Sequence, residues 1–424
     1  MLIRKPGSEG REGEPALILQ NHIDMVCEKN AGTVHDFLTD PIVPVIEGDW
    51  IRAQGTTLGA DNGAGMGIAM AALASAAIPH PPIEAVFTTD EEVGMIGASS
   101  FDASLLRGRR LLNLDSGVDA VITVSCAASA DVDISMPIEK SPPPEGFASY
   151  ELAVKGLVGG HSGVDIHKGF ANANILMARL LKELGGPDFR LCRIDGGAQR
   201  NAIPRECTAV VACAGSVSGT AKEAAARLEA AFRAEFPNDP GLSVTLEPSG
   251  PAISVMTSGN LERITGFILG APNGVLSMSA NIDGLVQTSS NLGVVITGES
   301  DVKAQIFPRS SSSAEQAETI RKHLALADSL GIGAKASNEK PPWEYRENSP
   351  LRDKAVEVFR AVYCTEPVIQ AIHAGLECGI FVEKIQDADA IAVGPVILGA
   401  HSPDEKMSLS SFNKLCEAVM RLLG

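Results

Sequence analysis

Five segments of the 424-residue chain carry a histidine or a carboxylate directly after an apolar stretch. The first, "LILQNHIDMV" (17–26), places His22 and Asp24 two residues apart, so both side chains emerge on the same side of a strand. There they can touch one another or a shared ion. The other segments are "GTTLGADNGAG" with Asp61, "AVFTTDEE" with Glu91 and Glu92, "LLNLDSG" with Asp115, and "AVGPVILGAHSPDE" with His401.

These residue types together indicate a metal site. Carboxylates a few ångströms apart raise each other's pKa, so they ionise together only beside a compensating cation. Imidazole and carboxylate ligands suit Zn²⁺, with Co²⁺ or Mn²⁺ as alternatives, and a carboxylate between two ions can bridge them at roughly 3.5 to 4 Å. Of two adjacent glutamates, one can ligate while the other takes a proton from water, which the metal pair activates as a hydroxide nucleophile.

Each residue taken singly also has an ordinary structural explanation. The His-x-Asp pair could simply begin a loop, and Asp61 could cap the helix that follows it. Glu91 and Glu92 could form a solvated first helical turn, and Asp115 could belong to a turn. The joint occurrence of these residues at successive strand ends favours the metal site.

The elements that position these residues alternate between strand and helix. The strand-like runs "ALILQ", "IEAVFTT" and "RLLNLD" flank the Ala-rich helical stretch "GAGMGIAMAALASAA". This order predicts an α/β fold with a mostly parallel sheet, in which the carboxyl ends of the parallel strands meet at one edge. The same pattern resumes at "NSPLRDKAVEVFRAVY" and continues through "PVIQAIH", "ADAIAVGP" and a closing helix from Ser411.

The middle of the chain has a different order of strands and helices. It contains the strand "YELAVKGLVGG", the helix "NANILMARLLKELGG", the strand "ECTAVVACA", the helix "TAKEAAARLEAAFRAEF" and strands near 275–307, a mixture typical of an α+β unit. We therefore predict a catalytic domain made of residues 1–130 and 336–424, with helices on both faces of its sheet. An inserted α+β domain of residues 131–335 interrupts it.

Composition excludes several classes of partner. The formal net charge is −17, the chain has no run of Lys and Arg, and both features argue against nucleic acid or an anionic membrane as a partner. No stretch of eighteen apolar residues and no signal-peptide pattern is visible. The eight cysteines include no Cys-x-x-Cys pair and suit buried thiols in a reducing compartment, so we predict a cytoplasmic protein.

At these residues the chain resembles the M20 family of metallopeptidases, and within it the aminoacyl-histidine dipeptidase branch. The resemblance runs nearly from end to end through the stretches "NHIDMVCEKN", "HDFLTDPI", "GTTLGADNGAGMG", "TTDEEVGMIGA", "LLNLDS", "KGLVGGHSGVDIHKG", "GGAQRNAIPRE", "MSANIDGLVQTSSNLGVV", "AIHAGLECGIF" and "GAHSPDE". It implies a site for two divalent ions with five ligands: Asp61 bridging the ions, His22 and Asp115 on one, and Glu92 and His401 on the other.

The resemblance also implies roles for five further residues. Glu91 would be the general base, and Asp24 would orient the His22 ring by hydrogen bonding. The inserted domain resembles the family's lid, which commonly forms a homodimer. There, His161 in "GGHSG" would polarise the scissile carbonyl, and Asn201 and Arg309 would hold the substrate.

Two features depart from the family pattern. Only twenty-one residues precede His22, where the family has a longer leader, so we expect either a start upstream or a catalytic domain that lacks its first elements. The segment "LDSGVDAVITVSCAAS" is also less acidic than in the dipeptidases, which bears on substrate preference.

The sequence thus predicts a metal-dependent hydrolase of small peptides, with unblocked dipeptides such as Xaa-His as substrates. The first alternative is an N-acyl amino acid amidohydrolase that uses the same site. The second is an inactive metal-binding or peptide-binding remnant.

Overall fold

The computed structural model describes residues 1–215, 218–280 and 282–424. The chain forms two compact units, Met1–Ala127 with Pro341–Gly424, and Ala128–Lys340. The second boundary lies later than the predicted 335/336. The reason is that β20 (Gly333–Lys340) pairs with β8 (Ala128–Pro137) and so belongs to the inserted unit.

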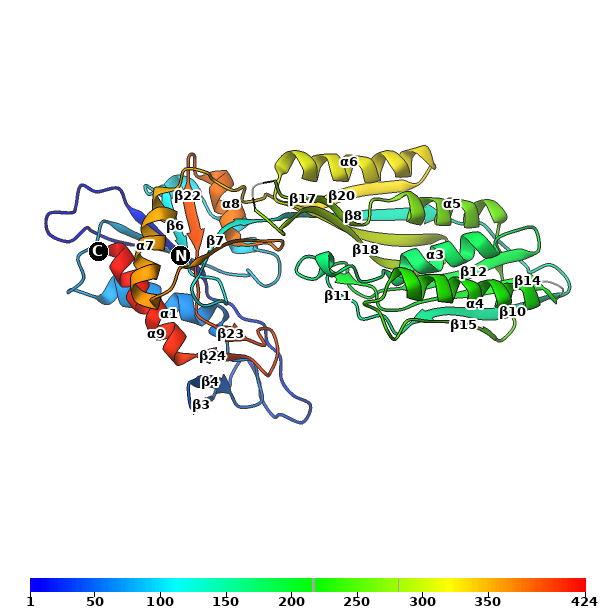
Figure 1. The fold of residues 1–424 in the computed structure, drawn as a ribbon, viewed down its shortest axis with the longest axis horizontal. Coiled ribbons are helices and arrows are strands. Elements are labelled where there is room, and N and C mark those ends of the chain that lie inside the picture. Colours follow the sequence, from blue (N-terminus) through cyan, green and yellow to red (C-terminus); the bar gives the residue numbers. More distant parts are fainter. Residues whose placement is uncertain (216–217, 281) are drawn as a thin grey trace. The chain divides into compact units, whose positions relative to one another are not determined.

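A twisted sheet forms the centre of the first unit (Figure 1). Its four neighbouring strands β5, β2, β6 and β22 run parallel, whereas β1 is antiparallel to β5 and β7 is antiparallel to β22. In spatial order the strands are β1 (Leu2–Lys5), β5 (Ile83–Thr88), β2 (Leu17–His22), β6 (Arg110–Asn113), β22 (Asp389–Ala392), β7 (Val121–Cys126) and β21 (Val368–Ile372).

Helices cover both faces of this sheet, as the fold class predicted. Because side chains alternate along β2, Leu17 and Leu19 join one hydrophobic core and Ile18 joins another. The first core packs against α1 (Ala60–Ala74), α7 (Pro350–Tyr363) and α9 (Leu409–Leu423). The second packs against α2 (Ile96–Ser100) and α8 (Glu377–Lys384).

The first unit also carries a small antiparallel sheet next to the segment of His401. Its strands are short and partly exposed, which explains why the hydrophobic pattern of the sequence did not mark them. In spatial order they are β23 (Ile397–Leu398), β24 (Lys406–Ser408), β4 (Trp50–Ala53) and β3 (Pro44–Glu47).

The inserted unit is built on an antiparallel sheet whose helices share one core. In spatial order its strands are β15 (Ser243–Pro248), β10 (Phe147–Lys155), β14 (Cys207–Ala214), β12 (Phe189–Gly196), β18 (Val286–Thr297), β19 (Asp301–Ser310), β8 and β20, with β17 (Gly274–Met278) beside β18. The helices are α3 (Ala173–Leu184), α4 (Ser218–Glu235), α5 (Ser258–Gly270) and α6 (Ser313–Ser329). Two short pairs complete it, β11 (Gly160–His161) with β13 (Ala202–Ile203) and β9 (Lys140–Ser141) with β16 (Val255–Met256).

Helix α3 shows how the sequence specifies these elements. The side chain of Asn172 accepts hydrogen bonds from the backbone N–H groups of Asn174 and Ile175, which caps the helix. Leu176, Met177, Leu180 and Leu181 recur at helical spacing and are buried against the sheet.

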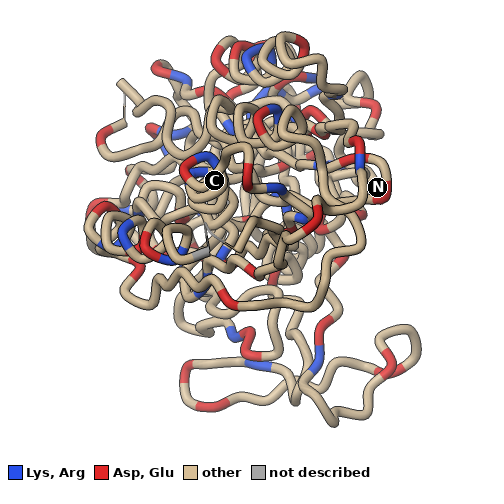
Figure 2. The backbone as a smooth tube through the Cα atoms, turned by 90° about the vertical axis from the view of Figure 1, so that its right-hand side faces the viewer, with Lys and Arg blue, Asp and Glu red and all other residues tan. Residues whose placement is uncertain are grey.

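Charged residues are spread along both units. Figure 2 shows Lys and Arg interspersed with Asp and Glu along the backbone. Within the described ranges, no helix is both long enough and apolar enough to cross a membrane.

Candidate metal centre

Three neighbouring parallel strands bring four of the predicted residues to one edge of the sheet. His22 is the last residue of β2 and lies opposite Thr88, the last residue of β5. Glu91 and Glu92 lie in the segment just after β5, and Asp115 follows β6, whose Asn113 pairs with Gln20 of β2. This is the edge at which α/β folds place their sites.

Asp61 lies between two histidines. Its Oδ1 is 3.1 Å from Nε2 of His22, and its Oδ2 is 3.3 Å from Nε2 of His401. Nε2 of His22 also lies 3.7 Å from Oδ1 of Asp115, and Nε2 of His401 lies 3.1 Å from Oε2 of Glu92. The structure therefore gathers all five predicted ligands into one connected cluster within the first unit.

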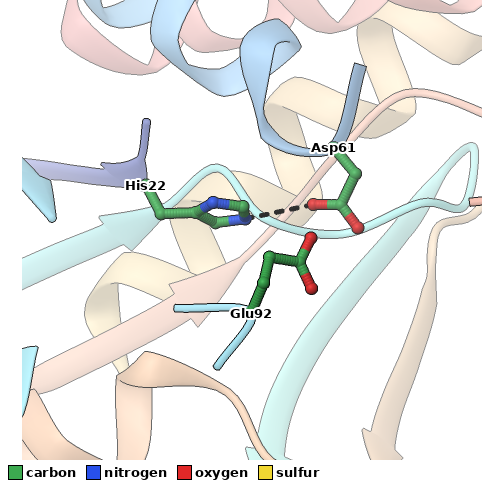
Figure 3. A group of neighbouring side chains, drawn as sticks. All are labelled: His22, Asp61 and Glu92. Carbon is green, nitrogen blue, oxygen red and sulfur yellow. Dashed lines mark hydrogen bonds and ion pairs between the residues drawn. The ribbon is translucent and has the colours of Figure 1, made fainter. Parts of the chain in front are cut away.

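The middle of the cluster is tight. One ligand atom each from His22, Asp61 and Glu92 lies within 4.8 Å of the other two. Figure 3 shows these three side chains pointing toward one another from the end of β2, the start of α1 and the segment after β5. Such a set of nitrogen and oxygen atoms matches the donors that Zn²⁺, Co²⁺ or Mn²⁺ takes.

Asp24 contacts two of these residues. Nδ1 of His22 is 3.0 Å from the backbone oxygen of Asp24 and 3.5 Å from its carboxylate, so the carbonyl is the nearer partner. A proton on Nδ1 that is donated to this oxygen leaves the lone pair of Nε2 directed at Asp61. The Asp24 carboxylate also accepts a hydrogen bond of 3.2 Å from the backbone N–H of Glu92.

Asp61 is not the N-cap of α1, contrary to its ordinary structural explanation. The N-cap is Gly59, with φ of 73°, and Asp61 has the non-helical angles φ −84° and ψ 104°. The peptide bond between Asp61 and Asn62 is cis. The regular helix therefore begins after these residues, and the Asp61 side chain remains directed at the two histidines.

The sequence reasoning missed Glu405, which holds the segment that carries Asp61. Its buried carboxylate accepts hydrogen bonds from the backbone N–H groups of Leu58 (2.7 Å), Gly59 (3.0 Å) and Asp61 (3.2 Å). In the sequence, the feature that could have pointed to Glu405 is its position four residues after the proposed ligand His401, in "HSPDE".

The two histidines and the carboxylates of this cluster shift one another's pKa values, because several negative charges are buried close together. Burial by itself would lower the pKa of His22, yet its bonds to Asp115 and Asp61 raise it to about 12. Hydrogen bonds to Asp61 and Glu92 raise the pKa of His401 to about 10. Against the effect of burial, both histidines hold the pKa of Asp61 well below its usual range.

Two carboxyl groups of the cluster have raised pKa values, which also indicates that negative charge is uncompensated there. Burial, with the negative charge of Asp115 beside it, raises the pKa of Glu91 to about 8. Burial raises the pKa of Asp115 itself to about 6. Oε1 of Glu92 is buried and, among the described residues, has no hydrogen-bond partner. A pair of divalent cations fits this set, because it satisfies that oxygen and supplies the charge that protons otherwise bring.

His161 and Arg309 lie together in the inserted unit. Nδ1 of His161 accepts hydrogen bonds from the backbone N–H groups of Gly163 (3.2 Å) and Val164 (3.0 Å). A neutral His161 therefore carries its proton on Nε2, which lies 3.5 Å from Nη2 of Arg309. Burial, aided by the charge of Arg309, lowers the pKa of His161 to about 4.

The third predicted residue of this unit, Asn201, precedes β13, the strand that pairs with β11. Its backbone oxygen accepts a hydrogen bond of 2.8 Å from the N–H of Ser162, whereas its side chain is exposed. Arg309 stacks on Phe307, with its guanidinium carbon 4.6 Å from the ring centre.

The chain is similar to known proteins along nearly its whole length. Residues 18–424 match the model of peptidase family M20/M25/M40. The chain is 36% identical over 428 residues to the cytosol non-specific dipeptidase of Escherichia coli, across 100% of this chain and 88% of that protein.

Solved structures are also similar to this chain over its whole length. The aminoacylhistidine dipeptidase from Vibrio alginolyticus is similar with a TM-score of 0.90 and 36% identity, across 100% of this chain and 87% of that chain. The aminopeptidase PepT from Bacillus cereus shares the fold at a TM-score of 0.53 and 15% identity, across 100% of this chain and 83% of that chain. The chain therefore belongs to the M20/M25/M40 family of peptidases.

Proposed function

We propose that this chain is a metal-dependent dipeptidase whose first unit holds two divalent cations. Asp61 would contact both cations, His22 and Asp115 would hold one, and Glu92 and His401 would hold the other. The observation that carries this assignment is that each carboxylate oxygen of Asp61 faces a different imidazole, at 3.1 and 3.3 Å. A carboxylate that caps a helix or pairs with one cation does not require that arrangement.

Glu91 is the general base of the reaction. When bound, the cations would supply Lewis-acid activation of water and would neutralise charge that develops on the scissile carbonyl. Glu91 adjoins the ligand Glu92 and has a raised pKa, and nearby dications lower the pKa of such a carboxyl group. It then takes a proton from water and delivers it to the leaving amine.

The inserted unit supplies contacts to the substrate. The Nε2–H of His161 suits an oxyanion, and the forked guanidinium of Arg309 suits the carboxylate of a short peptide. Asn201 provides a polar contact beside them. The substrates are dipeptides with free termini, including Xaa-His, and the names of the relatives from Escherichia coli and Vibrio alginolyticus support this class.

Three further properties belong to the same proposal. The metal is Zn²⁺, with Co²⁺ or Mn²⁺ as functional substitutes, because two imidazoles and three carboxylates suit these ions. The inserted unit mediates a homodimer. The protein works in the cytoplasm, which the description of the Escherichia coli relative as cytosolic supports.

Purified protein tests the proposal directly. It is stripped with a chelator, reloaded with Zn²⁺, Co²⁺ or Mn²⁺, and offered a panel of dipeptides beside N-acetyl amino acids. We expect release of free amino acids from dipeptides only after metal is added. Preferential cleavage of N-acetyl amino acids would replace the dipeptidase by an amidohydrolase, and metal binding without any hydrolysis would leave a binding protein.

A further inference from the structure

Glu377 is a buried carboxylate that the proposed reaction does not use. It is the first residue of α8, and none of its side chain is exposed. Its Oε2 accepts hydrogen bonds from Nε2 of Gln20 (2.5 Å) and from the hydroxyl of Thr88 (2.6 Å). Gln20 and Thr88 belong to β2 and β5, whose ends carry His22 and the segment of Glu91 and Glu92.

The contact with Gln20 is one link of a longer chain of hydrogen bonds. Nδ2 of Asn113 donates to Oε1 of Gln20 at 2.6 Å, and the backbone N–H of Asp115 donates to Oδ1 of Asn113 at 3.0 Å. Gln20, Asn113 and Glu377 are all fully buried. The chain therefore connects a proposed metal ligand to a carboxylate on another element without contact with solvent.

The donor direction of this chain is fixed. A backbone N–H can only donate, so Oδ1 of Asn113 must be the acceptor and its Nδ2 must donate to Gln20. Oε1 of Gln20 is then an acceptor, and its Nε2 must donate to Glu377. A chain with this direction must end on a group that accepts, and Glu377 is that group.

We propose that Glu377 is a positioning residue for the metal centre, which it orders as the final acceptor of the hydrogen-bond chain from Asp115 through Asn113 and Gln20. The inference rests on the proposed function only in that Asp115 and His22 bind metal. Gln20 lies two residues before His22 and therefore projects from the same face of β2. The chain thus links the ends of β2 and β6, the two strands that carry the ligands assigned to one ion.

The energetic argument favours this role over simple burial. A buried carboxylate without solvent contact costs stability unless hydrogen bonds compensate it. Burial, together with the negative charge of Asp115, raises the pKa of Glu377 to about 7 despite its two donors. Oε1 of Glu377 has no hydrogen-bond partner within the described ranges. An apolar side chain of similar size would be buried here at a lower cost in stability. We infer that the benefit that offsets this cost is the order that Glu377 gives to the strand ends that carry the metal ligands.

Two substitutions interrupt the chain without removing a proposed ligand. Glu377→Met keeps the length of the side chain and removes the acceptor, and Gln20→Met breaks the middle link. Metal binding is measured by competition of the stripped protein with a chromophoric chelator for Zn²⁺ and by the visible absorption spectrum of the Co²⁺-loaded protein. We expect both variants to bind one of two Zn²⁺ equivalents about 10- to 100-fold more weakly and to show an altered Co²⁺ spectrum.

Kinetics and a conservative variant separate positioning from general damage. In dipeptide hydrolysis at saturating metal, kcat should fall while KM stays within about twofold. Glu377→Gln keeps an acceptor oxygen for Gln20, so its metal affinity should lie between those of the wild type and Glu377→Met.

Asp389 provides a matched control in the same unit. It is a buried carboxylate that accepts hydrogen bonds from Ser349 (2.5 Å) and the N–H of Leu351 (2.9 Å), at the end of β22 away from the metal centre. Asp389→Asn should lower the melting temperature and leave Zn²⁺ affinity and the Co²⁺ spectrum unchanged.

The inference is overturned if folded Glu377→Met and Gln20→Met bind Zn²⁺ within about twofold of the wild type and keep its Co²⁺ spectrum. It is equally overturned if Asp389→Asn changes both metal readouts to the same extent. A wild-type protein that binds two metal equivalents but cleaves no dipeptide refutes the proposed function alone, because the metal readouts involve no substrate.

Discussion

At the scale of single residues, the adjacent Glu91 and Glu92 have different surroundings. Glu92 contacts His401 at 3.1 Å, whereas the pKa of Glu91 is raised to about 8 by burial and nearby negative charge. We expect Glu91→Gln to retain two metal equivalents and to lose about 10²- to 10⁴-fold in kcat, because the variant cannot take up a proton. Metal content and steady-state kinetics measure the two effects separately.

Glu92→Gln is the matched control for this substitution. Replacing an anionic ligand by an amide should weaken metal binding first, and added metal should restore part of the activity. Full turnover by Glu91→Gln would remove this residue from the mechanism, and loss of metal from that variant would make it a ligand instead.

His161 allows a second prediction at the same scale. Its Nδ1 accepts two backbone N–H groups, so its Nε2–H is available to stabilise a developing oxyanion. His161→Ala should lower kcat by about 10²- to 10³-fold without changing metal stoichiometry. Because the pKa of His161 is lowered to about 4, the wild-type profile of kcat between pH 5 and 8 should contain no step from this residue.

A variant outside the proposed contacts tests the specificity of that loss. Lys168 pairs with Asp165 at 2.6 Å on the same loop and is exposed. Lys168→Gln should alter kcat by less than about twofold, and a loss comparable to that of His161→Ala would show that the loop as a whole is responsible.

At the scale of elements, we expect His323 to make the packing of α6 depend on pH. Its ring is fully buried, Nε2 lies 2.9 Å from the hydroxyl of Ser290 on β18, and Nδ1 has no hydrogen-bond partner in the described part of the chain. Burial lowers the pKa of His323 from 6.5 to about 4. The folded state therefore binds this proton more weakly than the unfolded state does.

The sign of the effect follows from linkage. The contribution of His323 to the free energy of unfolding is fully present above pH 6.5 and is lost as the pH falls from 6.5 toward 4. The loss amounts to about 3 kcal/mol for a shift of this size. Urea unfolding at pH 7 and pH 4.5 should show a smaller difference for His323→Gln than for the wild type. An equal difference in the two proteins would contradict the assignment.

How far the elements could be predicted depends on their burial. The runs that became β2, β5 and β6 are buried on both faces, so hydrophobicity alone marked them and placed His22, Glu92 and Asp115 at one edge. The short strands β3, β4, β23 and β24 bury little and left no such pattern. Two of their pairings are local, β3 with β4 and β23 with β24, but the pairing of β24 with β4 joins segments far apart in the chain, which local sequence does not encode.

The same distinction applies to the site. Four of the proposed ligands, His22, Asp61, Glu92 and Asp115, could be predicted because each follows a strand or precedes a helix with a clear signal, whereas His401 lies in the connection between the short strands β23 and β24. Glu405 and Glu377 could not, because their partners lie more than 280 residues away and a lone glutamate is ordinarily exposed. The non-helical backbone at Asp61 was also invisible, since its neighbours predict the start of a helix.

At the scale of the whole molecule, the two units have separate hydrophobic cores and separate proposed tasks. All five proposed ligands lie in the first unit, whereas His161 and Arg309 lie in the second. The inserted unit could be predicted because the order of strand-like and helical segments changes in the middle of the chain and then reverts. The boundary near residue 340 could not be read there, because the edge strand β20 carries few large apolar residues.

This separation makes the response to metal local. A ligand that binds only the folded state stabilises it by about 2.7 kcal/mol at a hundredfold excess over Kd. Hydrogen exchange of the stripped and the Zn²⁺-loaded protein should therefore show slower exchange in β2, at the start of α1 and in the segments of Glu92 and His401. Exchange in β10, β14 and α4 of the inserted unit should change much less.

A variant of the bridging residue provides the control for that experiment. Asp61→Asn should abolish most of the metal-dependent protection in the first unit and leave exchange in α4 as in the wild type. Uniform protection of both units by Zn²⁺ in this variant would mean that the ion acts at sites other than the cluster around Asp61, because a cation held there stabilises first the elements that supply its ligands.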